Sequence, residues 1–135
     1  LTAGRVALAQ GDRRTAVRHA EKARKLAGRG EAAVAAERLL EHGVSEVVLH
    51  RGAEGATWIR EGQRASLPAF RVPPDNPTGC GDVFNAGYLF ATLPGGTPEE
   101  ALGTGNALAA LHLGDRRCPY PNLRHLRRFV RTALT

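Results

Sequence analysis

A glycine-rich turn that runs directly into a helix is the feature that most constrains this chain. The stretch Asn76-Pro77-Thr78-Gly79-Cys80-Gly81-Asp82 precedes an apolar, helix-spaced segment from Val83 to Phe90. Gly79 and Gly81 permit a tight bend and a close approach of the backbone to a ligand. The first amides of a helix lack acceptors within it and lie at the positive end of its dipole. The pattern therefore predicts an anion-binding turn suited to phosphate.

Asp82, at the junction of turn and helix, has two interpretations from the residues alone. It can cap the helix by accepting hydrogen bonds from the first amides, a role in which Asp is among the commonest residues. It can also act as a general base that takes a proton from a hydroxyl nucleophile. An isolated Gly-x-Gly-Asp favours the cap.

The longer stretch from Asn76 to Leu89 resembles the signature of the PfkB, or ribokinase-like, family of carbohydrate and nucleoside kinases. That signature runs Asp-Thr-Thr-Gly-Ala-Gly-Asp, then an aromatic residue, Asn or His, and a small residue. The resemblance implies that Gly79, Cys80 and Gly81 hold the transferred phosphoryl group, and that Asp82 is the catalytic base. It extends over roughly residues 31–130 and corresponds to the C-terminal part of a longer protein.

A second glycine turn, Gly52-Ala53-Glu54-Gly55, follows an apolar run. Ligands of open α/β sheets bind beyond the carboxyl ends of strands, although Gly-x-x-Gly by itself is only a tight turn. The resemblance implies a nucleotide loop here, with Gly52, Glu54 and Gly55 as its binding residues. Directly before this loop, the present sequence has His50-Arg51 where relatives have Thr-Leu or Lys-Leu. Arg51 then offers a cation to a phosphate.

The resemblance places two further sites. Asn106 matches a polar position near the adenine of the nucleotide, and its alternative is an ordinary surface amide. Asn76 and Thr78 fall where many relatives bind a monovalent cation behind the anion hole. Asn76 replaces the Asp that usually supports that cation, which weakens the expectation of one here, although Asp75 lies next to it.

The order of elements predicts an α/β fold. A helical pattern ends at His42-Gly43 and is followed by an apolar strand over 45–50, a helix-strand unit typical of parallel sheets. The segments 56–60 and 63–67 flank Glu61-Gly62 and predict a hairpin. A helix from Asp82 ends before Pro94, and a second begins at Thr97 with a capping box. A basic amphipathic helix over 123–134 follows. With the resemblance, we expect the C-terminal portion of a ribokinase-like three-layer α/β/α fold with a mainly parallel sheet.

We divide the chain into a poorly matched helical segment, 1–30, and the C-terminal part of a kinase domain, 31–135. The first segment predicts a helix from Arg13 to Leu26. The Asn-x-x-Glu motif that organises magnesium in relatives is expected near His19-Ala20-Glu21-Lys22, where it is degenerate. The chain has no methionine and begins at Leu1, so we expect it to be a fragment.

Composition excludes several classes of protein. The net charge is +6, from 19 Lys and Arg against 13 Asp and Glu, but the cations are scattered and lack the interleaved aromatics that stack bases. The sequence has no Walker P-loop, Rossmann fingerprint, nucleophile elbow or paired metal-ligand spacing. Two cysteines in different settings argue against a disulfide framework, and we expect a reduced, cytoplasmic protein without a membrane span.

The resemblance thus implies an ATP-dependent phosphotransferase acting on a hydroxyl of a sugar or related small alcohol, with ATP and Mg²⁺ as cofactors. Its partner is a sugar or nucleoside-like small molecule, and the full-length protein can form a homodimer. The residues do not specify which sugar is used. We expect little or no activity from the isolated chain. The alternatives are a catalytically idle nucleotide- or anion-binding remnant and a basic nucleic-acid-binding module.

Overall fold

The fold is a small sheet with helices on both faces. A computed structural model describes residues 30–118 and 120–133. The elements follow in the order α2 (Glu31–Glu41), β1 (Val47–His50), a 3₁₀ turn (Gly52–Glu54), β2 (Ala56–Arg60), β3 (Gln63–Leu67), α3 (Cys80–Thr92), α4 (Pro98–Gly114) and α5 (Leu123–Ala133). The predicted helix 13–26 and the degenerate magnesium motif lie outside the described residues.

The three described strands pair in the order β1-β2-β3, and both pairings are antiparallel. Val48 lies opposite Trp58, which in turn lies opposite Ala65. The parallel pairing expected for most of the sheet is not found among these strands. Two tight connections explain this, since neither the 3₁₀ turn after β1 nor the Glu61-Gly62 turn has the length of a parallel crossover. The predicted hairpin is confirmed at its expected bounds.

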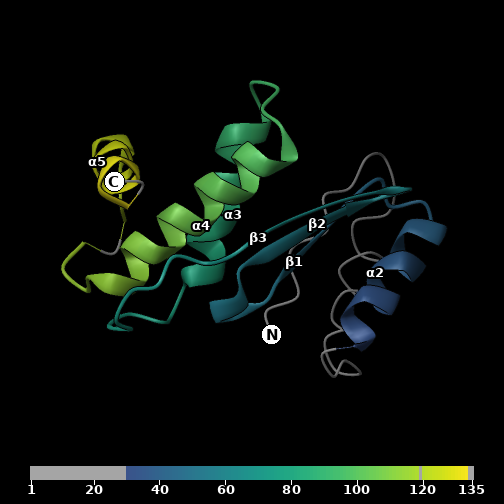
Figure 1. The fold of residues 1–135 in the computed structure, drawn as a ribbon, viewed down its shortest axis with the longest axis horizontal. Coiled ribbons are helices and arrows are strands. Elements are labelled where there is room, and N and C mark those ends of the chain that lie inside the picture. Colours follow the sequence, from purple (N-terminus) through teal and green to yellow (C-terminus); the bar gives the residue numbers. More distant parts are fainter. Residues whose placement is uncertain (1–29, 119, 134–135) are drawn as a thin grey trace.

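Alternating strand residues face two separate cores, which confirms the three layers. Val47 and Ile59 pack with Ala36 and Leu39 of α2 on one face. Buried residues on the other face pack against α3 and α4, and this core contains Val48, Ala56, Trp58, Ala65, Phe84, Tyr88, Ala101 and Leu102. Figure 1 shows α2 on one side of the sheet and the α3–α4 pair on the other.

Helices α3 and α4 pack closely because glycines face each other between them. A Cβ on Gly87 would lie 2.8 Å from Leu108 Cδ1 and 3.0 Å from the Thr104 carbonyl oxygen. A Cβ on Gly105 would lie 2.8 Å from the Phe84 ring. The capping box that begins α4 is confirmed, with Thr97 Oγ1 accepting from the Glu100 amide at 3.2 Å and Glu100 Oε2 accepting from the Thr97 amide at 2.9 Å.

Two element boundaries differ from the predictions. The first strand begins at Val47, because Ser45 lies in a bend after the α2 turn. Helix α3 begins at Cys80, two residues before the predicted Asp82. Within 30–118 and 120–133, no helix has both the length and the apolar character needed to cross a membrane.

Candidate active site

The predicted anion turn has the geometry of a helix start. Gly79 is the N-cap of α3 and has a left-handed backbone, with φ of 88°. The first bond of the helix runs from the Val83 amide to the Gly79 carbonyl at 3.0 Å. The N-cap residue is a glycine, so it makes no side-chain bond to the first turn. The amides of the first turn lie at the positive end of the helix dipole, and among them the Cys80 amide donates to the Pro77 carbonyl at 3.5 Å.

Asp82 is the third residue of α3 and its side chain is exposed. The interpretation of Asp82 as the N-cap is therefore wrong, because Gly79 occupies that position. The carboxylate lies one helical turn from Gly79, on the solvent side of the molecule rather than in the core. This leaves the general-base interpretation as a proposal.

The segment before the turn is tied to the C-terminal end of α4. The Asp75 and Asn76 amides both donate to the Leu113 carbonyl, at 2.8 and 2.9 Å. Nε2 of the buried His112 lies 2.7 Å from the Thr78 carbonyl oxygen and 3.2 Å from the Asn76 side-chain amide. These contacts fix the position of the turn relative to α4.

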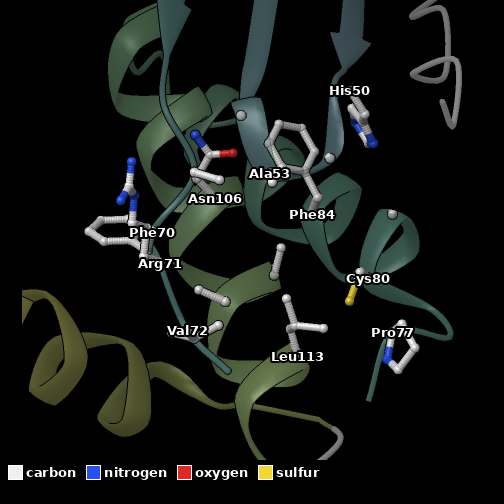
Figure 2. A pocket seen from close by; sticks show the side chains of 16 residues that line it. His50, Ala53, Phe70, Arg71, Val72, Pro77, Cys80, Phe84, Asn106 and Leu113 are labelled. Carbon is white, nitrogen blue, oxygen red and sulfur yellow. The ribbon is translucent and has the colours of Figure 1, made fainter. Parts of the chain in front are cut away.

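A cavity of about 460 Å³ opens between the two glycine turns and α4. Of the predicted site residues, Gly52, Gly55, Cys80, Gly81 and Asn106 line it. Figure 2 shows side chains from β1, α3, α4 and the 69–77 segment around it. The other predicted residues do not line it, namely Gly79, Asp82, Arg51, Glu54, Asn76 and Thr78.

The predicted nucleotide loop is a compact turn. The Arg51 amide donates to the Gly55 carbonyl at 2.8 Å, and the Gly55 amide donates to the Gly52 carbonyl at 3.0 Å. Gly55 has a φ of 96°, and a Cβ there would collide with the Leu67 carbonyl oxygen and the backbone of Pro68 and Ala69. The turn thus packs directly on the end of β3. Glu54 is exposed, and Arg51 is half-buried with its Nε lacking a hydrogen-bond partner among the described residues.

Asn106 is buried, with 5% of its surface exposed, so the surface-amide interpretation is wrong. Its Nδ2 donates to the Leu67 carbonyl at 3.3 Å and to the Pro68 carbonyl at 3.0 Å. These bonds hold α4 against the end of β3. In Figure 2 the Asn106 oxygen lies on the side of the amide nearer Ala53 and Phe84.

His50 ends β1 and lines the cavity, whereas the predicted site residues did not include it. The side chain is 7% exposed, and its ring meets Phe84 edge-on with centroids 4.1 Å apart. Burial lowers the pKa of His50 from 6.5 to about 4. Its Nε2 has no hydrogen-bond partner among the described residues. The sequence signal for this placement was the position of His50 shortly before the glycine turn at 52–55.

The residues that form the remaining walls of the cavity were not predicted from the sequence. They come largely from the extended segment after β3 and from small residues of α4, and they include Phe70, Val72, Ala109, Ala110 and Leu113. The prolines of the 68–77 segment were the signal that the chain runs extended there. Cys80 donates its thiol to the Asn76 carbonyl at 3.4 Å, and burial raises the pKa of that thiol.

The cavity has the size and lining of a small-molecule site. Its volume lies in the range of small-molecule sites, about 300–1,000 Å³, and its walls are mainly apolar with few polar groups. In the described part of the chain no group of three or more His, Cys, Asp or Glu side chains could hold a metal ion. Magnesium commonly binds through substrate phosphates with one or two carboxylates, which requires no such cage.

Comparisons with known proteins place this geometry in a family. The family model of the pfkB family carbohydrate kinases matches residues 16–123. An uncharacterized sugar kinase of Archaeoglobus fulgidus is 40% identical over 77 residues, which are 56% of this chain and 30% of that protein. The ribokinase of Thermotoga maritima superposes with a TM-score of 0.69 at 30% identity, over 74% of this chain and 34% of that one.

A putative ribokinase II of Escherichia coli, solved with ATP and Mg²⁺, superposes with a TM-score of 0.74 over 89% of this chain and 43% of its own. At 24% identity this likeness shows the ribokinase-like α/β fold. The chain spans about a third of the length of the first two relatives. Because the family model matches most of its residues, the chain belongs to the pfkB family of carbohydrate kinases.

Proposed function

We propose that this chain carries the nucleotide site, anion hole and catalytic base of an ATP-dependent kinase that phosphorylates a hydroxyl of a sugar or related small alcohol. The observation that carries the proposal is the cavity, because the Gly52–Gly55 turn and the start of α3 at Cys80 and Gly81 both line it. A nucleotide lying along this cavity would place its phosphates at the positive end of the helix dipole.

The two ends of the cavity would bind different parts of the nucleotide. The base and ribose of ATP would lie between the Gly52–Gly55 turn and α4, with Asn106 at the wall. Arg51 precedes that turn without lining the cavity, and its side chain would have to turn towards the nucleotide to meet a phosphate. The first-turn amides around Gly79, Cys80 and Gly81 would stabilise charge on the phosphoryl group as it moves. Mg²⁺ would enter with ATP and neutralise phosphate charge.

Asp82 would accept the proton from the attacking hydroxyl. Its place in the first turn of α3 keeps the carboxylate beside the anion hole, and its exposure leaves it accessible to a substrate. Positioning and electrostatic stabilisation supply most of the rate in phosphoryl transfer, and the base adds to them. The substrate would be a sugar or nucleoside-like alcohol in a reduced, cytoplasmic setting.

The test uses Asp82→Asn in the longest natural protein that contains this chain, assayed for sugar-dependent ADP formation. We expect turnover to fall about 100- to 10,000-fold, the usual contribution of a general base, while ATP still binds. Glu99→Gln is the matched control, since Glu99 is likewise an exposed carboxylate in the first turn of a helix, α4, but does not line the cavity, and should leave turnover unchanged. Unchanged turnover in Asp82→Asn would contradict the assignment of the base.

The 135-residue chain by itself should bind ATP and show little or no turnover. Calorimetric titration with ATP, followed by an assay against a panel of sugars, checks both statements. Nucleotide binding without turnover in the longer protein as well, unaffected by Asp82→Ala, would instead identify an idle nucleotide-binding remnant. Tight nucleic-acid binding with a steep salt dependence would point to a basic nucleic-acid module.

A further inference from the structure

A histidine side chain contacts the anion turn at the place where a monovalent cation was expected. His112 lies in the last part of α4 and is 4% exposed. Its Nε2 lies within hydrogen-bond distance of both predicted cation ligands, 2.7 Å from the Thr78 carbonyl oxygen and 3.2 Å from the Asn76 amide.

The short contact to Thr78 identifies the group that His112 presents. A carbonyl oxygen can only accept, so a nitrogen at 2.7 Å must carry the hydrogen and donate it. Asn76 presents its Nδ2 to the same ring nitrogen at 3.2 Å. Because two donors cannot bond each other, Asn76 accepts from this N–H only with its amide turned so that Oδ1 faces the ring. Side-chain amides turned by half a rotation have almost the same shape, so this orientation is available.

An ion bound by both Asn76 and Thr78 would have to lie between them, where the imidazole N–H now lies. Potassium is coordinated by several oxygens, backbone carbonyls among them. Here the Thr78 carbonyl oxygen is occupied by the His112 N–H, and Asn76 lacks the carboxylate that the family resemblance leads one to expect. Asp75 does not supply the missing carboxylate. Its Oδ2 accepts from the Arg116 amide at 2.8 Å, and its Oδ1 lies 3.7 Å from Arg116 Nε. The residues therefore do not fit the cation.

We propose that the His112 N–H takes the structural place of the monovalent cation, so that this kinase holds its anion turn without potassium. The proposal rests on the proposed function for the role of the turn. The imidazole connects α4 to the backbone of Thr78. The neighbouring Gly79 also faces the ring, since a Cβ added there would be in ordinary van der Waals contact with Nε2, at 3.5 Å. His112 is thus a positioning residue for the phosphate-binding amides.

The test measures the thermal unfolding midpoint of the 135-residue chain by circular dichroism, without nucleotide. KCl is titrated against choline chloride at constant ionic strength. We expect the two curves to coincide for the native chain. A saturable rise of the midpoint with KCl alone would overturn the proposal. Because no turnover is read, the result stands whether or not the chain proves to be part of an active kinase.

A double variant provides the converse measurement. Asn76→Asp with His112→Ala restores the carboxylate of the relatives and removes the ring, so potassium should now raise the midpoint relative to choline. A folded double variant with no response to potassium would show that the ring does not lie at an ion position, and would also overturn the proposal. In His112→Ala alone, added free imidazole should recover part of the lost stability. If the alanine variants fail to fold, the native comparison still decides.

Discussion

The backbone conformation of Gly79 sets the direction of the amides in the first turn of α3. Its left-handed backbone turns the chain from the extended 68–78 segment into α3, and only glycine adopts that conformation at little cost. Gly43, in the loop between α2 and β1, has nearly the same φ, 89° against 88°, but lies far from the cavity in sequence and does not line it. Substitutions at these two glycines can therefore be compared. Both change the stability cost of a left-handed backbone, but only one alters the turn beside the cavity.

We expect Gly79→Ala and Gly43→Ala to lower the free energy of unfolding by similar amounts, about 1–2 kcal/mol, because both force a side chain into the left-handed region. Only Gly79→Ala should also weaken ATP binding. Urea unfolding and calorimetric titration measure the two effects. Equal ATP affinity in both variants would argue against a role for the Gly79 turn in binding phosphate.

His50 should make stability depend on pH. Its pKa is about 4 in the folded chain against an ordinary 6.5, so the unfolded chain binds more protons between these values. Stability from neutral His50 is fully present above about pH 6.5 and is lost as the pH falls towards 4, by at most about 3 kcal/mol. Urea unfolding from pH 7 to pH 4.5 measures the slope, which His50→Leu should reduce. An identical slope in the variant would exclude His50 as its source.

At the scale of elements, close packing of α3 on α4 fixes the turn at Gly79–Gly81 relative to Asn106. The sequence of α4 contains Gly105 and several alanines, which are small enough for close packing. It could not show which glycines meet the neighbouring helix. Gly87 has backbone atoms of α4 within 3.1 Å of an added Cβ, whereas the nearest atom to a Cβ on Gly103 is Leu67 Cδ1 at 3.6 Å.

Gly87→Ala should therefore destabilise the chain by about 1–3 kcal/mol through overpacking. Gly103→Ala, also within a helix, should be neutral or stabilising by up to about 1 kcal/mol, because alanine favours helices. Chemical unfolding of both variants tests the difference. If Gly87→Ala is as stable as Gly103→Ala, the two helices are not held at the described distance.

The elements themselves were largely predictable because their signals are local. The capping box of α4, the hairpin turn at Glu61-Gly62 and the break at Pro94 all act within a few residues. The relative direction of the strands was harder to predict from the sequence. The helix-strand order favoured parallel pairing, but the pairing of β1 with β2 is decided by the short turn at 52–55, whose hydrogen bonds the sequence does not display.

At the scale of the molecule, the cavity exists because four distant parts of the chain converge. The glycine turns could be predicted since each has a recognisable pattern. The contribution of Phe70, Val72 and Leu113 could not, because it depends on where an extended segment crosses α4. The resemblance likewise named Asn76 and Thr78 as a pair but gave no indication that His112, far along the sequence, lies between them.

Filling the cavity should stabilise the whole molecule. With Mg-ATP at 100 times its dissociation constant, we expect the free energy of unfolding to rise by about 2.7 kcal/mol. Adenosine and tripolyphosphate, added separately, should each raise the thermal midpoint by less than ATP, because each occupies one end of the cavity. A midpoint that does not move with ATP would contradict the nucleotide site.

The buried contacts of Trp58 have a practical consequence. It is the only tryptophan of the chain, lies in the central described strand at 5% exposure, and donates from Nε1 to the Glu46 carboxylate at 3.0 Å. Tyr88 of α3 donates to the other oxygen of that carboxylate at 3.4 Å. Intrinsic fluorescence of this single indole therefore reports, without any added label, the moment at which the sheet separates from α3.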